Sequence, residues 1–284
     1  MTLRANGSYI GPRASAVSTT AASGVWDFRT AQRYQEEAAW PIVFSPAKIS
    51  GLQAWYDLSD ATTVTDSGGN ISQVDDKSGN DYHLAQATAA LKPTYETAAV
   101  NGLNVLTAIE DASANRQTVS TSNASLAAIG GADFTVATVA RMNTVGGSTG
   151  RADFFLWDTG GLSSDTVLVR FNNDTNDFRI FFRDAASDSL TVLSSDNLWS
   201  ADQLYVLITT VSGSTVTVYQ NNAQVATGSN AAVGPAPSFY SICRPLGGSS
   251  ASISVGEQVI YNSALSASGR TLLYDYLAAK WGIS

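Results

Sequence analysis

From Ile49 onward, the sequence consists of short segments rich in Val, Ile, Thr and aromatic residues, separated by turn-forming residues. Residues 166–172 and 177–183 each alternate between two faces, and the NNDTND stretch between them predicts a hairpin. Residues 215–219 alternate in the same way before the tight turn QNNAQ at 220–224. Many short strands without intervening helices predict an all-β fold, a two-sheet antiparallel jelly-roll sandwich.

The two ends of the chain depart from this pattern. Residues 263–284 carry Leu and aromatic residues at helical spacing, so we expect one C-terminal helix, capped by Ser266 or Ser268. Residues 1–40 show no strand alternation. They contain an extended stretch of small residues and one short helix-like segment that ends at Pro41. The sequence therefore predicts an N-terminal arm at 1–48 and a single domain at 49–284.

A helix as short as the one in this arm is marginal alone and needs a surface to pack on. That surface belongs either to its own domain or to another subunit, and the sequence leaves both open. On the second interpretation, the residues expected to make anchoring or oligomer contacts are Tyr9, Ile10, Pro12, Trp26, Phe28, Tyr34 and Trp40.

Composition excludes several function classes. Charged residues make up 14% of the chain, against about 25% in an average soluble domain. Ser and Thr, 62 residues together, take their place. The net charge of −8 argues against a nucleic-acid partner, which requires a basic face. No apolar run is long enough to span a membrane, and the first twenty residues lack the apolar core of a secretory signal, so we expect neither.

The scarcity of reactive side chains argues against an enzyme. One cysteine and one histidine, Cys243 and His83, cannot form a disulfide or a Cys/His zinc site. Retaining glycoside hydrolysis needs two carboxylates about 5–5.5 Å apart. No two glutamates share a predicted strand at a spacing that would give such a pair, so we expect no catalytic residues. The glutamates considered are Glu36, Glu37, Glu96, Glu110 and Glu257.

The DDKSGND stretch concentrates oxygen ligands in a loop, which makes Asp75, Asp76 and Asp81 a weak calcium candidate. Its spacing does not match a calcium-binding loop, and Lys77 repels a cation. The favoured interpretation is an Asx-type turn whose carboxylates accept backbone N–H bonds. We therefore expect no bound metal and no cofactor.

Both ends of the predicted domain resemble LamG-like, concanavalin A-like jelly-roll domains of bacterial and phage proteins. The opening matches at Trp55, Asp57, Ser59, Val74, Asp76, Ser78, Gly79, Pro93, Asn101 and Gly102. The closing stretch ISVGEQVIYNSALSASGRTLLYDYLAAKWGI matches a final strand followed by a Y-L-x-x-K-W-G helix. One departure is Val74-Asp75, where the family usually has Trp before Asp. The resemblance covers residues 49–284 and implies the same sandwich fold.

A sugar-binding surface needs an exposed aromatic ring beside polar groups. Trp157, Trp199 and Tyr240 are the best candidates because each adjoins a loop, although the usual place of a sandwich tryptophan is the core. Arg170 and Arg179 lie on the polar phase of adjacent strands, so they either face solvent or grip an anionic glycan or a neighbouring subunit.

The segment before Pro41 is similar to the leading segment of phage tail-associated proteins. The two resemblances together predict a virion structural protein, tail-associated as a fibre, tip or spike. Its arm would bind other virion proteins, its sandwich would bind a cell-surface glycan, and it would work as a homo-oligomer. The alternatives are a free carbohydrate-binding module or lectin of a bacterial surface system, and a head-decoration protein, with a glucanase held in reserve.

Overall fold

The computed structural model describes residues 44–109, 117–129, 132–144, 151–158, 166–172, 177–183, 189–193, 198–229, 239–246 and 252–283. Contacts divide the chain into two units, Met1–Ser45 and Pro46–Ser284. The predicted arm contacts at Tyr9, Ile10, Pro12, Trp26, Phe28, Tyr34 and Trp40 lie outside the described residues.

One layer of the second unit is an antiparallel sheet centred on β17, whose ten residues are all buried. In spatial order its strands are β1 (Leu52–Asp57), β17 (Ser252–Tyr261), β8 (Phe134–Thr144), β13 (Tyr205–Ser212), β14 (Thr215–Gln220) and β15 (Ala223–Ser229). The predicted hairpin at QNNAQ joins β14 to β15. Its Asn221 and Asn222 both have positive φ, as a tight two-residue hairpin turn requires.

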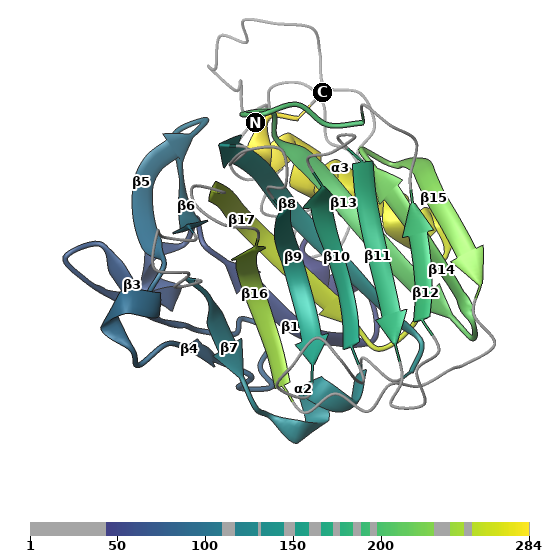
Figure 1. The fold of residues 1–284 in the computed structure, drawn as a ribbon, viewed down its shortest axis with the longest axis horizontal. Coiled ribbons are helices and arrows are strands. Elements are labelled where there is room, and N and C mark those ends of the chain that lie inside the picture. The colour runs from purple at the N-terminus through teal and green to yellow at the C-terminus, as the bar shows by residue number, and fades with distance from the viewer. Residues whose placement is uncertain are drawn as a thin grey trace, which may run out of the picture. The chain divides into compact units, whose positions relative to one another are not determined.

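The other layer is also antiparallel. Its strands are β7 (Val119–Thr121), β16 (Phe239–Leu246), β9 (Arg151–Asp158), β10 (Thr166–Asn172), β11 (Asp177–Arg183) and β12 (Ser189–Leu193). The predicted pairing of 166–172 with 177–183 is confirmed, with Asn172 opposite Asp177. Figure 1 shows this layer in front of the β8 sheet.

Short strands between β1 and β8 connect the two layers. β6 (Leu103–Ile109) pairs with β17, while β4 (Leu84–Ala85) pairs with β7 of the other layer. The remaining elements in the described part of the chain are β2 (Val64–Ser67), β3 (Asn70–Val74), β5 (Thr94–Val100), the short helix α2 (Ala124–Ile129) and the 3₁₀ turns η1 (Pro46–Lys48), η2 (Ala61–Thr63) and η3 (Ala89–Leu91).

Alternation along the strands divides the buried residues between two cores. On β8, Val136 and Ala140 point between the two layers, where they meet aromatic side chains of β9, β10, β11 and β16. Ala137 and Val139 point to the opposite face of the same sheet. A sheet with apolar side chains on both faces needs a cover on its outer side, because exposed apolar area costs about 25 cal/mol per Å².

Helix α3 (Ala267–Trp281) provides that cover, with Leu273, Leu277 and Trp281 packed on the outer face of the β8 sheet (Figure 1). The helix begins at Ser266, whose hydroxyl accepts the Gly269 N–H, as one of the two predicted caps. The predicted sandwich with a C-terminal helix is therefore confirmed. Within the described part of the chain, no helix has the length and apolar character needed to cross a membrane.

Candidate functional site

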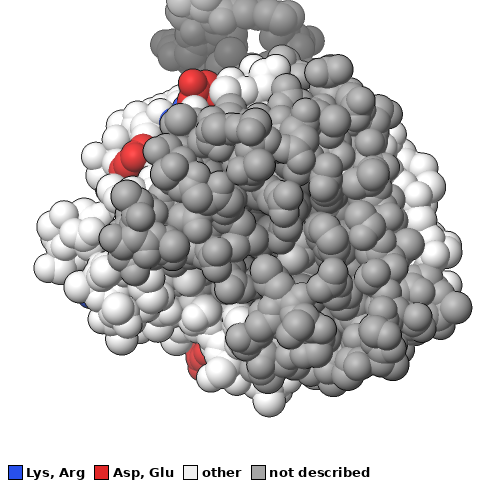
Figure 2. Space-filling model, in the orientation of Figure 1, with Lys and Arg blue, Asp and Glu red and all other residues white. Residues whose placement is uncertain are grey.

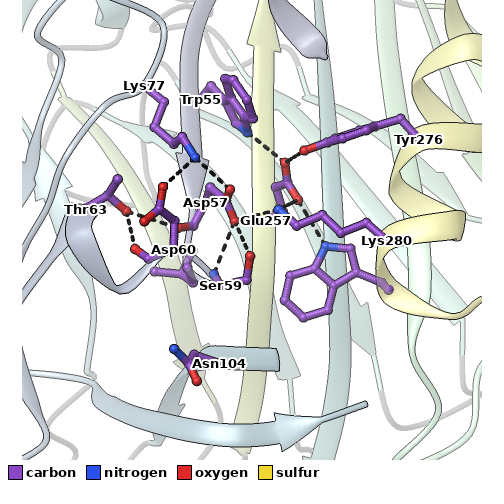
Figure 3. A network of polar contacts seen from close by, with 12 residues as sticks. Trp55, Asp57, Ser59, Asp60, Thr63, Lys77, Asn104, Glu257, Tyr276 and Lys280 are labelled. Atoms are coloured by element: carbon purple, nitrogen blue, oxygen red, sulfur yellow. Dashed lines mark hydrogen bonds and ion pairs between the residues drawn. The ribbon is translucent and has the colours of Figure 1, made fainter. Parts of the chain in front are cut away.

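A buried glutamate joins the sheet to the end of α3 (Figure 3). Glu257 of β17 is fully buried. Its Oε1 accepts hydrogen bonds from the Trp55 indole at 2.7 Å and the Tyr276 hydroxyl at 2.9 Å. Its Oε2 accepts from Lys280 Nζ at 2.7 Å and from the Trp281 indole at 3.0 Å. Four donors from β1 and α3 therefore converge on one carboxylate.

Asp57, the residue opposite Glu257 on β1, belongs to the same network. Lys280 Nζ lies 2.7 Å from its Oδ1, and Lys77 Nζ lies 2.9 Å from its Oδ2. Burial alone would raise the pKa of Asp57, but the hydrogen bonds from Lys280 and Ser59 and the Lys280 charge outweigh it and lower the pKa. Lys77 also binds Asp60 at 2.7 Å, and this hydrogen bond is the main reason that the pKa of Asp60 falls to about 2.

Asp57 and Glu257 form a carboxylate pair that spacing along a single strand does not reveal. Asp57 and Glu257 come from the two ends of the domain and meet only because β1 pairs with β17. The oxygens of both carboxylates are bound to lysines, indoles and hydroxyls of the protein, and Lys280 bridges the two residues. The arrangement fixes the last turn of α3 on the sheet.

The carboxylate of Asp76 fixes the loop beside β1. Asp76 Oδ1 accepts the backbone N–H groups of Trp55 and Ser78, each at 2.8 Å. Its Oδ2 accepts the Ser78 hydroxyl at 2.7 Å and the Tyr82 N–H at 3.2 Å. His83 Nδ1 accepts the Asp76 N–H at 3.0 Å. The predicted Asx-type turn is therefore observed.

The other two calcium candidates lie beside His83. Its Nδ1 is 3.6 Å from Asp75 Oδ1, and its Nε2 is 3.9 Å from Asp81 Oδ1. Across the described residues, no three His, Cys, Asp or Glu side chains are grouped in a way that would hold a metal ion.

The predicted aromatic platform is wrong. Trp157 and Tyr240 are fully buried, with ring centroids 4.7 Å apart, and the Trp157 indole donates to the Leu126 carbonyl. Trp199 is 2% exposed and packs on Phe171 at 5.0 Å. All three rings belong to the core between the layers, so none offers a face to a sugar.

Arg170 and Arg179 lie directly opposite each other on β10 and β11. The structure describes their backbone but not their side chains. Their grouping on neighbouring strands is thus observed, while their predicted contact with a glycan or a subunit stays a prediction.

A pocket of about 330 Å³ opens at the C-terminal end of α3. Four separate segments form it: the β5–β6 turn, the end of β8, the loop before β13 and the residues after α3. Its lining residues are Ala99, Val100, Asn101, Arg141, Asp202, Gln203, Leu204, Gly282 and Ile283.

Backbone geometry holds the walls of this pocket in place. Asn101 and Gly282 face each other with positive φ, and a Cβ on Gly282 would lie 3.0 Å from Asn101 Nδ2. Asn101 Nδ2 also donates to the Trp281 carbonyl at 2.6 Å, which ties the turn to the helix end. On the other side, the Asp202 N–H donates to the Met142 carbonyl at 2.7 Å.

The pocket is polar where it meets solvent and charged at one wall. Asp202 and Gln203 are exposed, and Arg141 is partly buried with its Nε shielded from solvent and without a hydrogen-bond partner. Sequence reasoning missed this site because its four segments are distant in the chain. Only the Asn101-Gly102 pair, which predicts a turn, gives a local signal.

A sequence profile described as the concanavalin A-like lectin/glucanases superfamily matches residues 113–268 of this chain, more than half of its length. The chain belongs to the concanavalin A-like lectin/glucanase superfamily. The predicted family resemblance is therefore confirmed. Among curated proteins, no sequence matches this member of the superfamily.

Several solved structures contain a similar sandwich. The binding domain of Paraclostridial Mosquitocidal Protein 1 superposes with a TM-score of 0.61 at 15% identity, covering 82% of this chain and 53% of that one. The binding domain of botulinum neurotoxin DC, solved with rat synaptotagmin II and with SialylT, gives 0.59 at 9% identity, with 82% and 52% covered. This superfamily member thus spans about half the length of those domains.

The sandwich is also similar to that of an enzyme. Trypanosoma rangeli sialidase superposes with a TM-score of 0.50 at 14% identity, covering 86% of this chain and 35% of the sialidase. Identities this low show a shared fold only, so the function of this superfamily member has to be argued from its own site.

Proposed function

We propose that this chain is a lectin-like domain that binds a carbohydrate in the pocket at the end of α3, without catalysing a reaction. The observation that carries the proposal is the pocket itself. It is a concave, mostly polar site of about 330 Å³ in which Asn101, Asp202, Gln203 and Arg141 supply hydrogen-bond donors and acceptors. Ligand sites for small molecules have this combination of a concave shape with a few placed polar groups.

Rigidity of the walls supports binding, because a preorganised site loses less conformational entropy when a ligand enters. The Glu257 network fixes the last turn of α3, and Asn101 joins that turn to the opposite wall. Asp202 is held to β8 through its backbone. The polar side chains therefore stand on supported backbone.

The burial and hydrogen bonds of the clustered carboxylates favour binding over hydrolysis. Glycoside hydrolysis uses two carboxylates that both reach the substrate. The clustered pair, Asp57 and Glu257, is buried and hydrogen-bonded within the protein. Among the described residues that line the pocket, Asp202 is the one carboxylate.

We further propose that the domain acts on a virion, as a tail-associated adhesion protein anchored by residues 1–48. The similarity of the N-terminal segment to phage tail-associated proteins supports this role. On the face drawn in Figure 2, few of the described side chains are charged, which supports contact with a neutral polar partner. Single sugar contacts are weak, and repeated copies on a particle compensate because later binding events become intramolecular.

Deletion of residues 1–40 separates the virion role from its alternatives. An anchored virion protein keeps a folded domain but no longer assembles into particles or oligomers, whereas a free carbohydrate-binding module or lectin loses nothing. Mass spectrometry of purified particles then distinguishes a tail location from a head-decoration role.

A glycan array tests carbohydrate binding. The purified full chain should bind a defined subset of glycans, and the double variant Asp202→Gly, Gln203→Ala should lose that binding. Glycine is chosen at 202 because Asp202 has a φ of +61°. Gln224→Ala, an exposed change on β15, is the matched control and should bind like the natural chain. Absence of any bound glycan, or equal loss in the control, contradicts the proposal.

A further inference from the structure

Arg141 is the one cation among the described residues that line the pocket. It lies on the same face of β8 as Ala137 and Val139, beyond the end of α3. Its Nε is buried and has no hydrogen-bond partner, and no carboxylate of the described residues lies within ion-pair distance of it. A buried guanidinium donor of this kind is costly unless something accepts its hydrogen bond.

The neighbouring polar side chains do not provide that acceptor. Ser254, opposite Arg141 on β17, shares a hydrogen bond with Thr107 at 2.8 Å. Asn143 donates to the Ser254 hydroxyl at 2.7 Å and to the Ser252 hydroxyl at 3.1 Å. These bonds use the two serine hydroxyls, the Thr107 hydroxyl and Asn143 Nδ2, while Asn143 Oδ1 is itself buried without a hydrogen-bond partner. Arg141 therefore lines the pocket without an acceptor among the described side chains around it.

We propose that Arg141 receives the carboxylate of an acidic sugar. This inference rests on the proposed carbohydrate site and names its ligand class. A guanidinium carries five donors in a planar fork that matches a carboxylate with two parallel hydrogen bonds. Asp202 and Gln203 then face the sugar hydroxyls, which a carboxylate and an amide bind well.

The charges of the pocket and of the whole chain favour a sugar with one carboxylate over a polyanion. The pocket offers a single cation beside the carboxylate of Asp202, and the whole chain carries a net charge of −8. A heavily sulfated or phosphorylated chain would meet repulsion from both. A uronic or nonulosonic acid within an otherwise neutral glycan brings one negative charge to one guanidinium.

The test uses two sugars that differ at one group, methyl β-D-glucuronide and methyl β-D-glucoside, titrated into the ¹⁵N-labelled full chain. The Arg141 Nε–H resonance and the dissociation constants are the readouts. We expect the glucuronide to bind about 10-fold more tightly than the glucoside and to shift the Nε–H resonance. Arg141→Gln should reduce that preference to about 2-fold or less, and Lys48→Gln, which removes an exposed cation elsewhere, should keep it.

The other outcomes distinguish failure of the acidic-sugar inference from failure of the carbohydrate site. Equal binding of the two sugars, or a preference that survives Arg141→Gln, overturns the acidic-sugar inference and leaves the carbohydrate site standing. Glutarate binding as tightly as the glucuronide shows carboxylate recognition without a sugar and also overturns it. Failure of both sugars and of every arrayed glycan to bind overturns the carbohydrate site itself. If Arg141→Gln does not fold, the natural chain's preference and the Arg141→Lys variant decide, since lysine lacks the planar fork and should weaken the preference.

Discussion

The indole of Trp281 lies directly on the backbone of Gly256, so closely that a Cβ at position 256 would sit 2.3 Å from the ring carbon Cη2. Gly256 precedes the buried Glu257 on β17, and the Trp281 indole donates to that carboxylate at 3.0 Å. Glycine in the interior of a strand is unfavourable in general. Here it gives the last turn of α3 room to reach the sheet.

Gly256→Ala should therefore destabilise the domain by about 1–3 kcal/mol, the usual cost of overpacking a filled core. Urea unfolding followed by tryptophan fluorescence measures this change. The control is Gly269→Ala in the first turn of α3, where a Cβ meets only ordinary contacts. It should be neutral or stabilise by up to about 1 kcal/mol. Equal stability of the Gly256→Ala variant and the natural chain would show that the tryptophan is not packed there.

Removal of the Lys280 charge should lower the free energy of unfolding more than Gly256→Ala does. Lys280→Met leaves the buried carboxylates of Glu257 and Asp57 without their shared cation. We expect a loss of about 3 kcal/mol, because an uncompensated buried charge costs several kcal/mol. Lys48→Met, which changes an exposed lysine, should alter the unfolding free energy by less than about 0.5 kcal/mol. If Lys280→Met lowered the unfolding free energy as little as Lys48→Met, solvent would already screen the charges of the network.

The stability of the domain should fall in acid for a defined reason. The pKa values of Asp57 and Asp60 are lower in the folded chain than the ordinary value of 3.8. The stability that these two carboxylates add is therefore complete above the pKa that they have in the unfolded chain. It is lost as the pH falls through their pKa values in the folded chain, which for Asp60 is about 2. Unfolding free energies measured between neutral pH and pH ~2 should show this decline.

Lys77→Met tests the cause of the lower Asp60 pKa. Since the hydrogen bond from Lys77 is its largest cause, the variant should move the pKa of Asp60 from about 2 back toward 3.8. Carboxyl ¹³C resonances followed through an acid titration report this value directly. The Lys48→Met variant should leave it unchanged, and an unmoved Asp60 in Lys77→Met would contradict the assigned cause.

Substitution of Trp157 should lower the stability of the domain and leave glycan binding unchanged. Trp157→Phe keeps an aromatic ring in the core but loses the indole hydrogen bond to the Leu126 carbonyl. We expect a loss of about 1–3 kcal/mol, because that buried carbonyl loses its donor. Glycan binding per folded molecule, measured below the unfolding temperature, should stay the same. Lost binding with unchanged stability would restore Trp157 as a sugar platform.

The sandwich could be predicted because its signal is local. Alternation in segments such as 166–172 and 215–219 sets which side chains point inward, whatever the rest of the chain does. The same periodicity places Tyr240 with Ile242 on the inward face. It does not place Trp157, because residues 154–157 of β9 are all apolar and the register of this strand shifts beside Phe154. For Tyr240, nearness to a loop in the sequence was the weaker signal.

The sites could not be predicted because they are made by pairing distant segments. Asp57 and Glu257 are separated by two hundred residues and become neighbours through the register of β1 on β17. Arg141, Asp202 and Asn101 reach one pocket from a strand, a loop and a turn that are far apart in the chain. No spacing within a single segment records either arrangement.

The central claim is that the pocket at the end of α3 binds a carbohydrate. Its most direct test is a ¹H–¹⁵N correlation spectrum of the full chain, recorded during titration with the glycan that binds best on an array. We predict that the largest shifts fall on residues 99–101, 202–204 and 282–283. Shifts that cluster elsewhere, for example along Thr215–Ser229, or a spectrum unchanged by every arrayed glycan, would contradict the account.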